Sequence, residues 1–216
     1  MNKSKNYFER KCNKENLTSS FTQKTDQVGN KYINIHQDLL DRCTKGDKGA
    51  QFEIYRLYYK SMYNSSLRIV GSAEEAEDIM QESFLSAFQK LKTFSGDVSF
   101  GAWLRKIVIN RSLDVLRKRK VVFEELHAEL PIANEAEPEG EPITVEEVKS
   151  AINSLPDGYR TILSLVLLEG YDHEEVSEIL GIKNVTSRTQ FSRARQRLKE
   201  ILIENKKQHT REKIYG

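Results

Sequence analysis

The sequence predicts an all-α protein made of two small helical domains joined by a flexible acidic linker. Apolar residues recur three and four positions apart in several stretches, and no stretch alternates with period two for long enough to be a strand. Three of the four prolines and a run of acidic residues without Lys or Arg lie together between Val121 and Val148, which is typical of a linker. Basic residues concentrate on both sides of that run, which indicates two cationic domains.

The N-terminal part of the chain is predicted to hold a polar tail followed by one helical domain. Residues 1–33 are rich in Lys, Asn, Ser and Thr without a sustained period, so we expect a disordered tail. Residues 34–120 form the domain, in which Ser72 with Glu75 three positions on marks a helix start. The expected elements are helices over 50–70 and 72–92, a break at 93–99, and a helix from 100 into the basic residues 117–120.

The C-terminal part is predicted to form a smaller four-helix domain. Thr144 and Glu147 have the spacing of a capping box, so we expect the first helix to start there and to run to Leu155. Pro156-Asp-Gly158 breaks this helix, and a second one follows. The expected ranges are 121–143 for the acidic linker, 144–206 for the domain, 159–169 for its second helix and 207–216 for a terminal tail.

Residues 169–199 are the most informative stretch of the chain. They read as two helices joined by a short turn, with Asp172 and Glu175 as a capping box and Gly181 as a C-terminal cap of the first helix. From Lys183 to Lys199 there are several cations and no acidic residue. One side of this second helix carries an apolar stripe, and the other carries hydroxyls and cations. The pattern favours a helix-turn-helix that enters a DNA groove, with an amphipathic surface helix as the alternative.

Composition excludes several classes of site. The two cysteines, Cys12 and Cys43, lie far apart without nearby ligand partners, and the four histidines are scattered. Neither a disulfide framework nor a metal site is therefore expected, and no cofactor is implied. No run approaches the roughly 18 to 20 apolar residues of a membrane span, and the N-terminus lacks the apolar segment of a signal peptide. We expect a cytoplasmic protein without membrane insertion.

Several motifs together resemble one protein family. The segments Ala76–Phe84 and Thr93–Asn110, followed by Asp114 and the basic residues, are similar to region 2 of bacterial sigma factors. Ile152–Arg160 and the helix-turn-helix with Ser192–Arg195 are similar to region 4. Because there is no room for a region 3 domain between them, the chain resembles the extracytoplasmic-function (ECF) group of the sigma-70 family, over roughly 35–120 and 144–203.

The resemblance implies a factor that binds RNA polymerase core and directs promoter-specific initiation, with the −35 element read as duplex and the −10 element as an opened strand. The implied −35 contacts are Arg188, Thr189, Ser192, Arg193 and Gln196. Phe94 and Asn110 would flank a pocket for an unstacked −10 base, and phosphates would be held by Arg105, Lys106, Arg111, Arg117 and Lys118. Core packing for Phe94 and an internal hydrogen bond for Asn110 are the structural alternatives.

The resemblance also implies partners. Asp78, Gln81 and Glu82, on the acidic side of the 72–92 helix, would dock on the clamp helices of the polymerase core, although such a side is usually only solvated. The polymerase flap, promoter DNA and an anti-sigma factor are the other implied partners. The acidic linker is expected to thread toward the active-site and RNA-exit channels of the polymerase.

Two rival functions fit parts of the sequence. An ordinary dimeric helix-turn-helix regulator would explain 144–203 but would leave the basic Trp-containing domain and the acidic linker unused. An enzyme acting on nucleic acid, such as a nuclease, would need clustered carboxylates or a metal set. The acids of this chain lie in the linker or along helix shoulders instead, so no enzymatic activity is expected.

One position departs from the family pattern. At the turn into the second helix the family usually carries Gly-Thr, whereas this chain has Val185-Thr186. Because valine tolerates a positive φ poorly, we expect that the turn is built differently or that the helix begins earlier.

Overall fold

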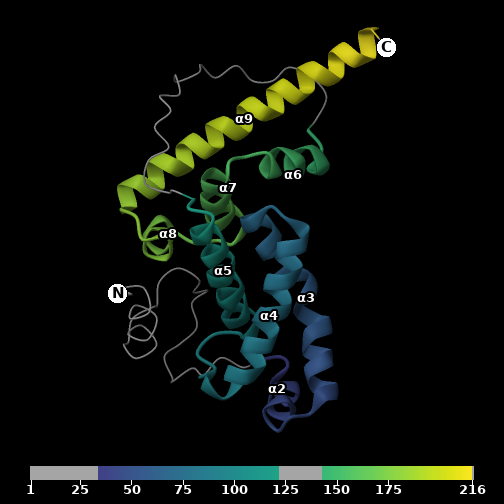
Figure 1. Ribbon diagram of the computed structural model, residues 1–216, viewed down its shortest axis with the longest axis vertical. Coiled ribbons are helices and arrows are strands. Elements are labelled where there is room, and N and C mark those ends of the chain that lie inside the picture. The colour runs from purple at the N-terminus through teal and green to yellow at the C-terminus, as the bar shows by residue number, and fades with distance from the viewer. Residues whose placement is uncertain (1–33, 122–142, 216) are drawn as a thin grey trace, which may run out of the picture. The chain divides into compact units, whose positions relative to one another are not determined.

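The regular elements of the computed structural model are all helical within the residues that it describes, 34–121 and 143–215. An N-terminal lobe holds α2 (Gln37–Thr44), α3 (Lys48–Val70), α4 (Ala73–Lys90), the 3-10 turn η1 (Leu91–Thr93) and α5 (Phe100–Lys118) (Figure 1). A C-terminal lobe holds α6 (Val145–Asn153), α7 (Asp157–Leu163), η2 (Ser164–Leu168), α8 (His173–Leu180) and α9 (Asn184–Tyr215). The predicted all-α class with two helical domains is confirmed. The expected tail, 1–33, and nearly all of the acidic linker lie outside the described residues.

Side-chain caps fix where the helices of the N-terminal lobe begin. Asp47 Oδ1 accepts hydrogen bonds from the amides of Gly49 and Ala50, at 2.8 and 3.1 Å, at the start of α3. Ser72 and Ser99 cap α4 and α5 in the same way. The three helices then pack along one another over a shared core (Figure 1). Its largest fully buried side chains are Ile54, Met62, Ile69, Phe100, Leu104, Ile109, Leu113 and Leu116.

The start of α5 is also tied to the beginning of the described chain. The first amides of a helix have no partner within the helix, so a buried start needs an acceptor from elsewhere. Asn34 Oδ1 accepts from the backbone amide of Phe100 at 2.7 Å, and both residues are buried. This contact holds residue 34 against the loop that carries Phe94.

The helix starts predicted for the C-terminal lobe are confirmed. Thr144 with Glu147 and Asp172 with Glu175 both form complete capping boxes, at α6 and α8. Gly181 ends α8 in the left-handed conformation, with φ of 73°. The break at Pro156 is present too, but α7 starts at Asp157, two residues earlier than predicted, and gives way to the π-helical turn η2.

α9 runs from Asn184 to Tyr215, so nearly all of the segment 207–216, expected to be a terminal tail, is helical. The prediction ended the helix where its apolar stripe ends, near Leu202. Beyond that point the sequence has no Gly or Pro before residue 216 and consists largely of Lys, Glu, Gln and Arg, which are good helix formers. The intrinsic helix propensity of these residues therefore extends α9 beyond the end of its apolar stripe.

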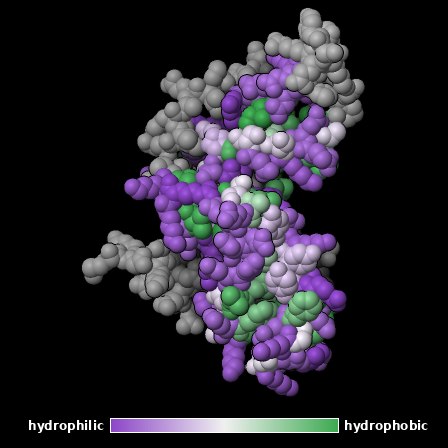
Figure 2. Space-filling model, turned by 45° about the vertical axis from the view of Figure 1, so that its right-hand side comes forward, coloured by the Kyte–Doolittle hydropathy of each residue, from purple (hydrophilic) through white to green (hydrophobic). Residues whose placement is uncertain are grey.

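Among the residues that the structure describes, no helix is both long and apolar enough to cross a bilayer. The face drawn in Figure 2 is mostly hydrophilic, with hydrophobic areas confined to small patches.

Candidate nucleic-acid interface

One side of α9 presents the residues predicted to contact the −35 element. Arg188, Thr189 and Ser192 are exposed, whereas Arg193 and Gln196 are half-buried. At about 100° per residue, all five project within roughly 140° of the helix circumference. The helix therefore brings the predicted −35 set together on a single side.

The opposite side of α9 is buried. Over residues 184–208, where the exposure of α9 is described, the buried residues are Ser187, Gln190, Ala194 and Ile201, so two of these four are polar. Sequence reasoning missed Gln190, which is only 3% exposed, because a glutamine between cations reads as a surface residue. The signal in the sequence was its position three residues after Ser187 and four before Ala194, which places all three on one side of the helix.

A contact between α8 and α9 braces the helix-turn-helix. His173, the first residue of α8, lies with Nδ1 3.0 Å from Oγ of Ser187, and its ring packs edge-on against Phe191 at 5.3 Å. Val185 needs no positive φ, because α9 already begins at Asn184 and Val185 lies exposed in its first turn. Of the two alternatives for this turn, the earlier helix start is confirmed.

Phe94 belongs to an aromatic cluster at the start of α5. Its ring lies 5.3 Å from that of Trp103 and 5.8 Å from that of Phe100, and it remains half-buried. Gly96 follows in the same loop with φ of 80°. The loop thus puts an incompletely covered ring beside the only tryptophan of the chain.

Asn110 lies on the same side of α5 as Trp103. Residues seven apart return to nearly the same direction on a helix, so Trp103, Asn110 and Arg117 form one row, with Lys106 beside it. Asn110 is half-buried, and no hydrogen bond joins its amide to another described residue. Its side chain is therefore available for an external partner on the side that leads back to the aromatic cluster.

The structure does not gather the predicted −10 cations into one set. Arg111 pairs with Glu82 at 2.6 Å, and Arg117 pairs with Asp114 at 2.7 Å. Lys118 is exposed at the end of α5. Arg105 points to another side of α5, where its guanidinium lies 3.4 Å from both Ser61 Oγ and the Glu169 carboxylate.

The predicted polymerase-binding residues form a continuous surface on α4. Asp78, Gln81 and Glu82 are all exposed, on the side away from the buried Ile79, Met80 and Phe84. Leu85 extends this row by one helical turn and is 64% exposed. Sequence reasoning missed Leu85, although an apolar residue three positions after Glu82 on a polar side was the visible signal.

Comparisons with known proteins agree with this division into lobes. The family model for sigma-70 region 2 matches residues 54–121, and the model for sigma-70 region 4 matches residues 146–198. Together the two matches cover more than half of the chain.

Curated relatives extend the match across most of the chain. The ECF RNA polymerase sigma factor SigW of Bacillus subtilis is 31% identical over 177 residues, which is 76% of this chain and 94% of SigW. The RNA polymerase sigma-H factor of Pseudomonas aeruginosa is 30% identical over 182 residues, 77% of this chain and 93% of that factor. Among solved structures, the sigma factor RpoE in complex with the anti-sigma factor NepR from Bartonella quintana has a TM-score of 0.48 and 23% identity, covering 69% of this chain and 94% of that one. By its two family-model matches and its curated relatives, the chain belongs to the ECF group of sigma-70 RNA polymerase sigma factors.

Proposed function

We propose that this sigma factor directs initiation by gripping a promoter at two places, with α9 on −35 duplex and α5 with the preceding loop on the −10 strand. The observation that carries the proposal is the exposed side of α9, where Arg188, Thr189 and Ser192 lie together in a helix-turn-helix lobe that matches region 4. A duplex major groove accepts one helix and offers base edges to guanidinium and hydroxyl groups.

The −10 element poses a different problem, because a base in an opened strand must be taken out of its stack. Unstacking costs a few kcal/mol and needs a pocket that receives the base. The half-buried ring of Phe94 offers stacking area, and the Asn110 amide offers both donors and an acceptor to a base edge. Lys106, Arg111, Arg117 and Lys118 then hold the flanking phosphates, whereas Arg105 is not on their side of α5.

The α4 surface is the proposed contact with the polymerase core. Asp78, Gln81 and Glu82 supply carboxylate and amide groups to the clamp helices, and Leu85 adds an apolar contact in the same row. Glu82 must exchange its partner Arg111 when the clamp binds; an exposed pair of this kind is worth only about 0 to 1 kcal/mol, so the exchange is cheap. The flap and an anti-sigma factor are further proposed partners, and the protein would act in the cytoplasm with the polymerase.

Run-off transcription with purified core polymerase on a library of promoter fragments tests the function. We expect initiation at specific fragments only when both the core and this protein are present. A stand-alone helix-turn-helix regulator would instead bind an operator tightly without polymerase and would not redirect the core. That second result would overturn the proposal.

The −35 contact is tested by Arg188→Ala on a promoter found in that screen. Loss of a base or phosphate contact should weaken promoter binding by about 1 to 3 kcal/mol, roughly five- to 150-fold, with a smaller salt dependence if the contact is to phosphate. Lys207→Ala is the matched control, because it removes one exposed charge from the same helix beyond the region 4 match. Equal effects of the two variants would contradict the −35 assignment.

The −10 contact is tested by Asn110→Ala on fragments with each base substitution in the −10 element. The ranking of bases should change at one position, while affinity for core polymerase stays the same. Asn64→Ala, at an exposed asparagine of α3, is the matched control. An unaltered −10 ranking in the Asn110 variant would remove Asn110 from the pocket.

A further inference from the structure

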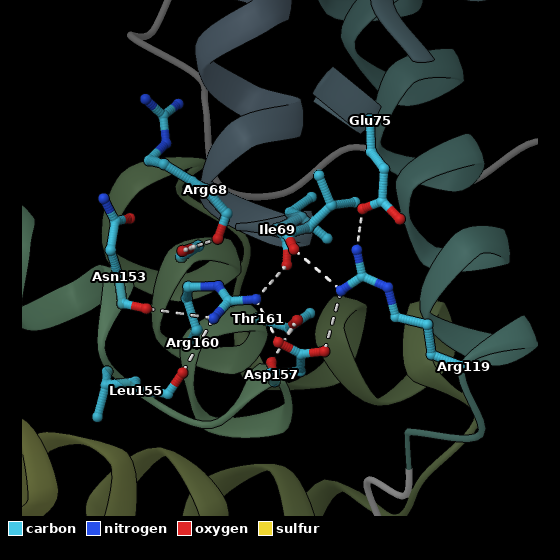
Figure 3. A network of polar contacts seen from close by, with 11 residues as sticks. Arg68, Ile69, Glu75, Arg119, Asn153, Leu155, Asp157, Arg160 and Thr161 are labelled. Carbon is cyan, nitrogen blue, oxygen red and sulfur yellow. Dashed lines mark hydrogen bonds and ion pairs between the residues drawn. The ribbon is translucent and has the colours of Figure 1, made fainter. Parts of the chain in front are cut away.

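Arg160, the arginine of α7, is not available to DNA. It is 4% exposed, and its guanidinium donates to the carbonyls of Leu155 at 2.9 Å and Ile69 at 3.3 Å (Figure 3). It also pairs with the carboxylate of Asp157 in the same helix (Figure 3). A buried guanidinium needs such partners, so the role of Arg160 is structural. The arginines of this lobe that can reach a base therefore lie on α9.

Val185 is an apolar side chain on the side of α9 that is proposed to face DNA. It is 73% exposed, more than any other large apolar side chain that the structure describes in the C-terminal lobe. At about 100° per residue, it projects within about 60° of Arg188, Thr189 and Ser192. Val185 is the second residue of α9, and the N-terminal residues of the second helix of a helix-turn-helix are those that reach base edges. Its isopropyl group thus lies where bases come closest.

Two hydrogen bonds arrange the side chains around Val185. Asn184 Oδ1 accepts from Arg188 Nε at 2.8 Å, a bond that does not use the two terminal nitrogens of the guanidinium. Thr189 Oγ1 donates to the Val185 carbonyl at 2.9 Å, so the backbone takes its hydroxyl proton. Positions 185 and 189 are neighbours on the helix surface. The start of α9 therefore presents a guanidinium and, beside it, an apolar area.

The chemistry of the major groove limits what an isopropyl group can recognise. The apolar group that base edges offer there is the C5 methyl of thymine, and the other groups that identify a base are hydrogen-bond donors and acceptors. Against those groups, or against a phosphate, an isopropyl group would displace water without replacing its hydrogen bonds. Contact with a methyl group removes apolar surface of both partners from water, which is favourable. A valine in this place therefore favours thymine.

We propose that Val185 selects a thymine of the −35 element through its C5 methyl group. Three residues along a helix rise about 4.5 Å, close to the spacing of base pairs, so this thymine lies within about two base pairs of the Arg188 contact. The inference deepens the proposed function and rests on it, because it names a base that α9 reads. Sigma factors of this family usually carry glycine here, which has no side chain to offer. The departure at Val185 thus makes this position a specificity determinant.

Deoxyuridine, which is thymidine without the C5 methyl group, tests the contact from the DNA side. In a promoter found by the run-off screen, each thymine of the −35 element is replaced by deoxyuridine in turn, on either strand. Binding of core polymerase with the wild-type chain is then measured. One replacement should weaken binding by about fourfold, the effect of one methyl group left in water. Its position should lie next to the base pair whose preference is lost in Arg188→Ala.

Val185→Ala tests the same contact from the protein side. This variant should bind the thymine and uracil forms of that position equally, and about as weakly as the wild type binds the uracil form. Val145→Ala is the matched control, because Val145 is 63% exposed and lies in the first turn of α6. It should keep the fourfold difference of the wild type. Val185→Ile retains a branched apolar group and should keep the difference too.

Three results would overturn the assignment of Val185. The first is equal binding of the thymine and uracil forms by the wild type at every −35 position. The second is a methyl dependence that is the same in the wild type and in Val185→Ala. The third is a loss of binding in Val185→Ala that is equal on all sequences, as loss of a contact with the DNA backbone would give.

These results are separable from failure of the proposed function, which is decided by run-off transcription with the wild-type chain. If the wild type starts transcription but does not distinguish thymine from uracil, only the assignment of Val185 falls. If the wild type fails in run-off, the promoter reading falls. The same deoxyuridine replacements are then made in the duplex that the free chain selects, and the same results decide the methyl contact there.

Discussion

At the scale of single residues, burial and the nearby carboxylate of Glu169 shift the pKa of Tyr171. Burial, and then the nearby negative charges of Glu169 and Glu175, raise the pKa of the Tyr171 phenol to about 12. In the unfolded chain the same phenol ionises near pH 10. The folded state therefore holds this proton more tightly, and the stability that follows is fully present below about pH 10 and is lost as pH rises through about 12.

Tyr171→Phe tests this titration. We expect the free energy of unfolding of the wild type to fall more steeply than that of the variant between about pH 10 and 12, because only the wild type has the phenol to ionise. Urea unfolding at several pH values measures the free energy of unfolding of both proteins. The lysines and the other tyrosines titrate alike in the two, so their contributions cancel in the difference. Parallel curves over this range would contradict a raised pKa at Tyr171.

Single residues also show where the sequence stops being informative. Exposure of Arg188, Thr189 and Ser192 followed from their spacing on α9, as did the exposure of Asp78, Gln81 and Glu82 on α4. The burial of Gln190 and the contact of His173 with Ser187 did not, since each depends on how α8 and α9 cross. A periodicity reports on one helix at a time.

At the scale of helices, short-range chemistry fixes the starts. Asp172 Oδ1 accepts from the amides of both Glu174 and Glu175 at 2.8 Å, and the Asp172 amide in turn donates to Glu175 Oε2 at 3.0 Å. All three contacts lie within four consecutive residues, so the sequence predicted them. The far end of α9 was not predictable from the apolar stripe, because propensity and not packing extends it to Tyr215.

Asp172→Ala should weaken the start of α8 and with it the support of α9. Loss of this N-cap is expected to cost about 0.5 to 2 kcal/mol of stability, while Asp172→Asn should retain most of it because asparagine caps comparably well. Urea unfolding measures the cost, and binding of −35 duplex shows whether it is transmitted to α9. Equal free energies of unfolding for Asp172→Ala and Asp172→Asn would contradict a stabilising role of this N-cap.

At the scale of the whole molecule, the sequence patterns of single helices did not predict the contacts between the lobes. Arg68 and Glu169 are 101 residues apart, and Arg160 and Ile69 are 91 apart. Arg105 and Arg117 read as phosphate contacts because their charges fit DNA, and nothing near them in sequence announces Glu169 or Ile179 as partners.

Coupling between the lobes is testable with a reporter in one and a deletion in the other. Trp103, the single tryptophan, reports on the N-terminal lobe. Leu165→Ala should lower the urea midpoint seen by Trp103 fluorescence, since Leu165 packs into that lobe's cluster and such deletions cost about 2 to 5 kcal/mol. Leu163→Ala, the same deletion in the C-terminal lobe's own cluster, should shift this midpoint less. Equal midpoints for wild type and Leu165→Ala would show that the lobes unfold independently.

The bond between Asn34 and the amide of Phe100 sets a practical boundary for protein engineering. Trimming that removes Asn34 would leave a buried amide at the head of α5 with no acceptor, an omission that typically costs about 1 to 3 kcal/mol. Expression variants that are shortened for crystallisation should therefore keep residue 34, even though the first described helix starts only at Gln37.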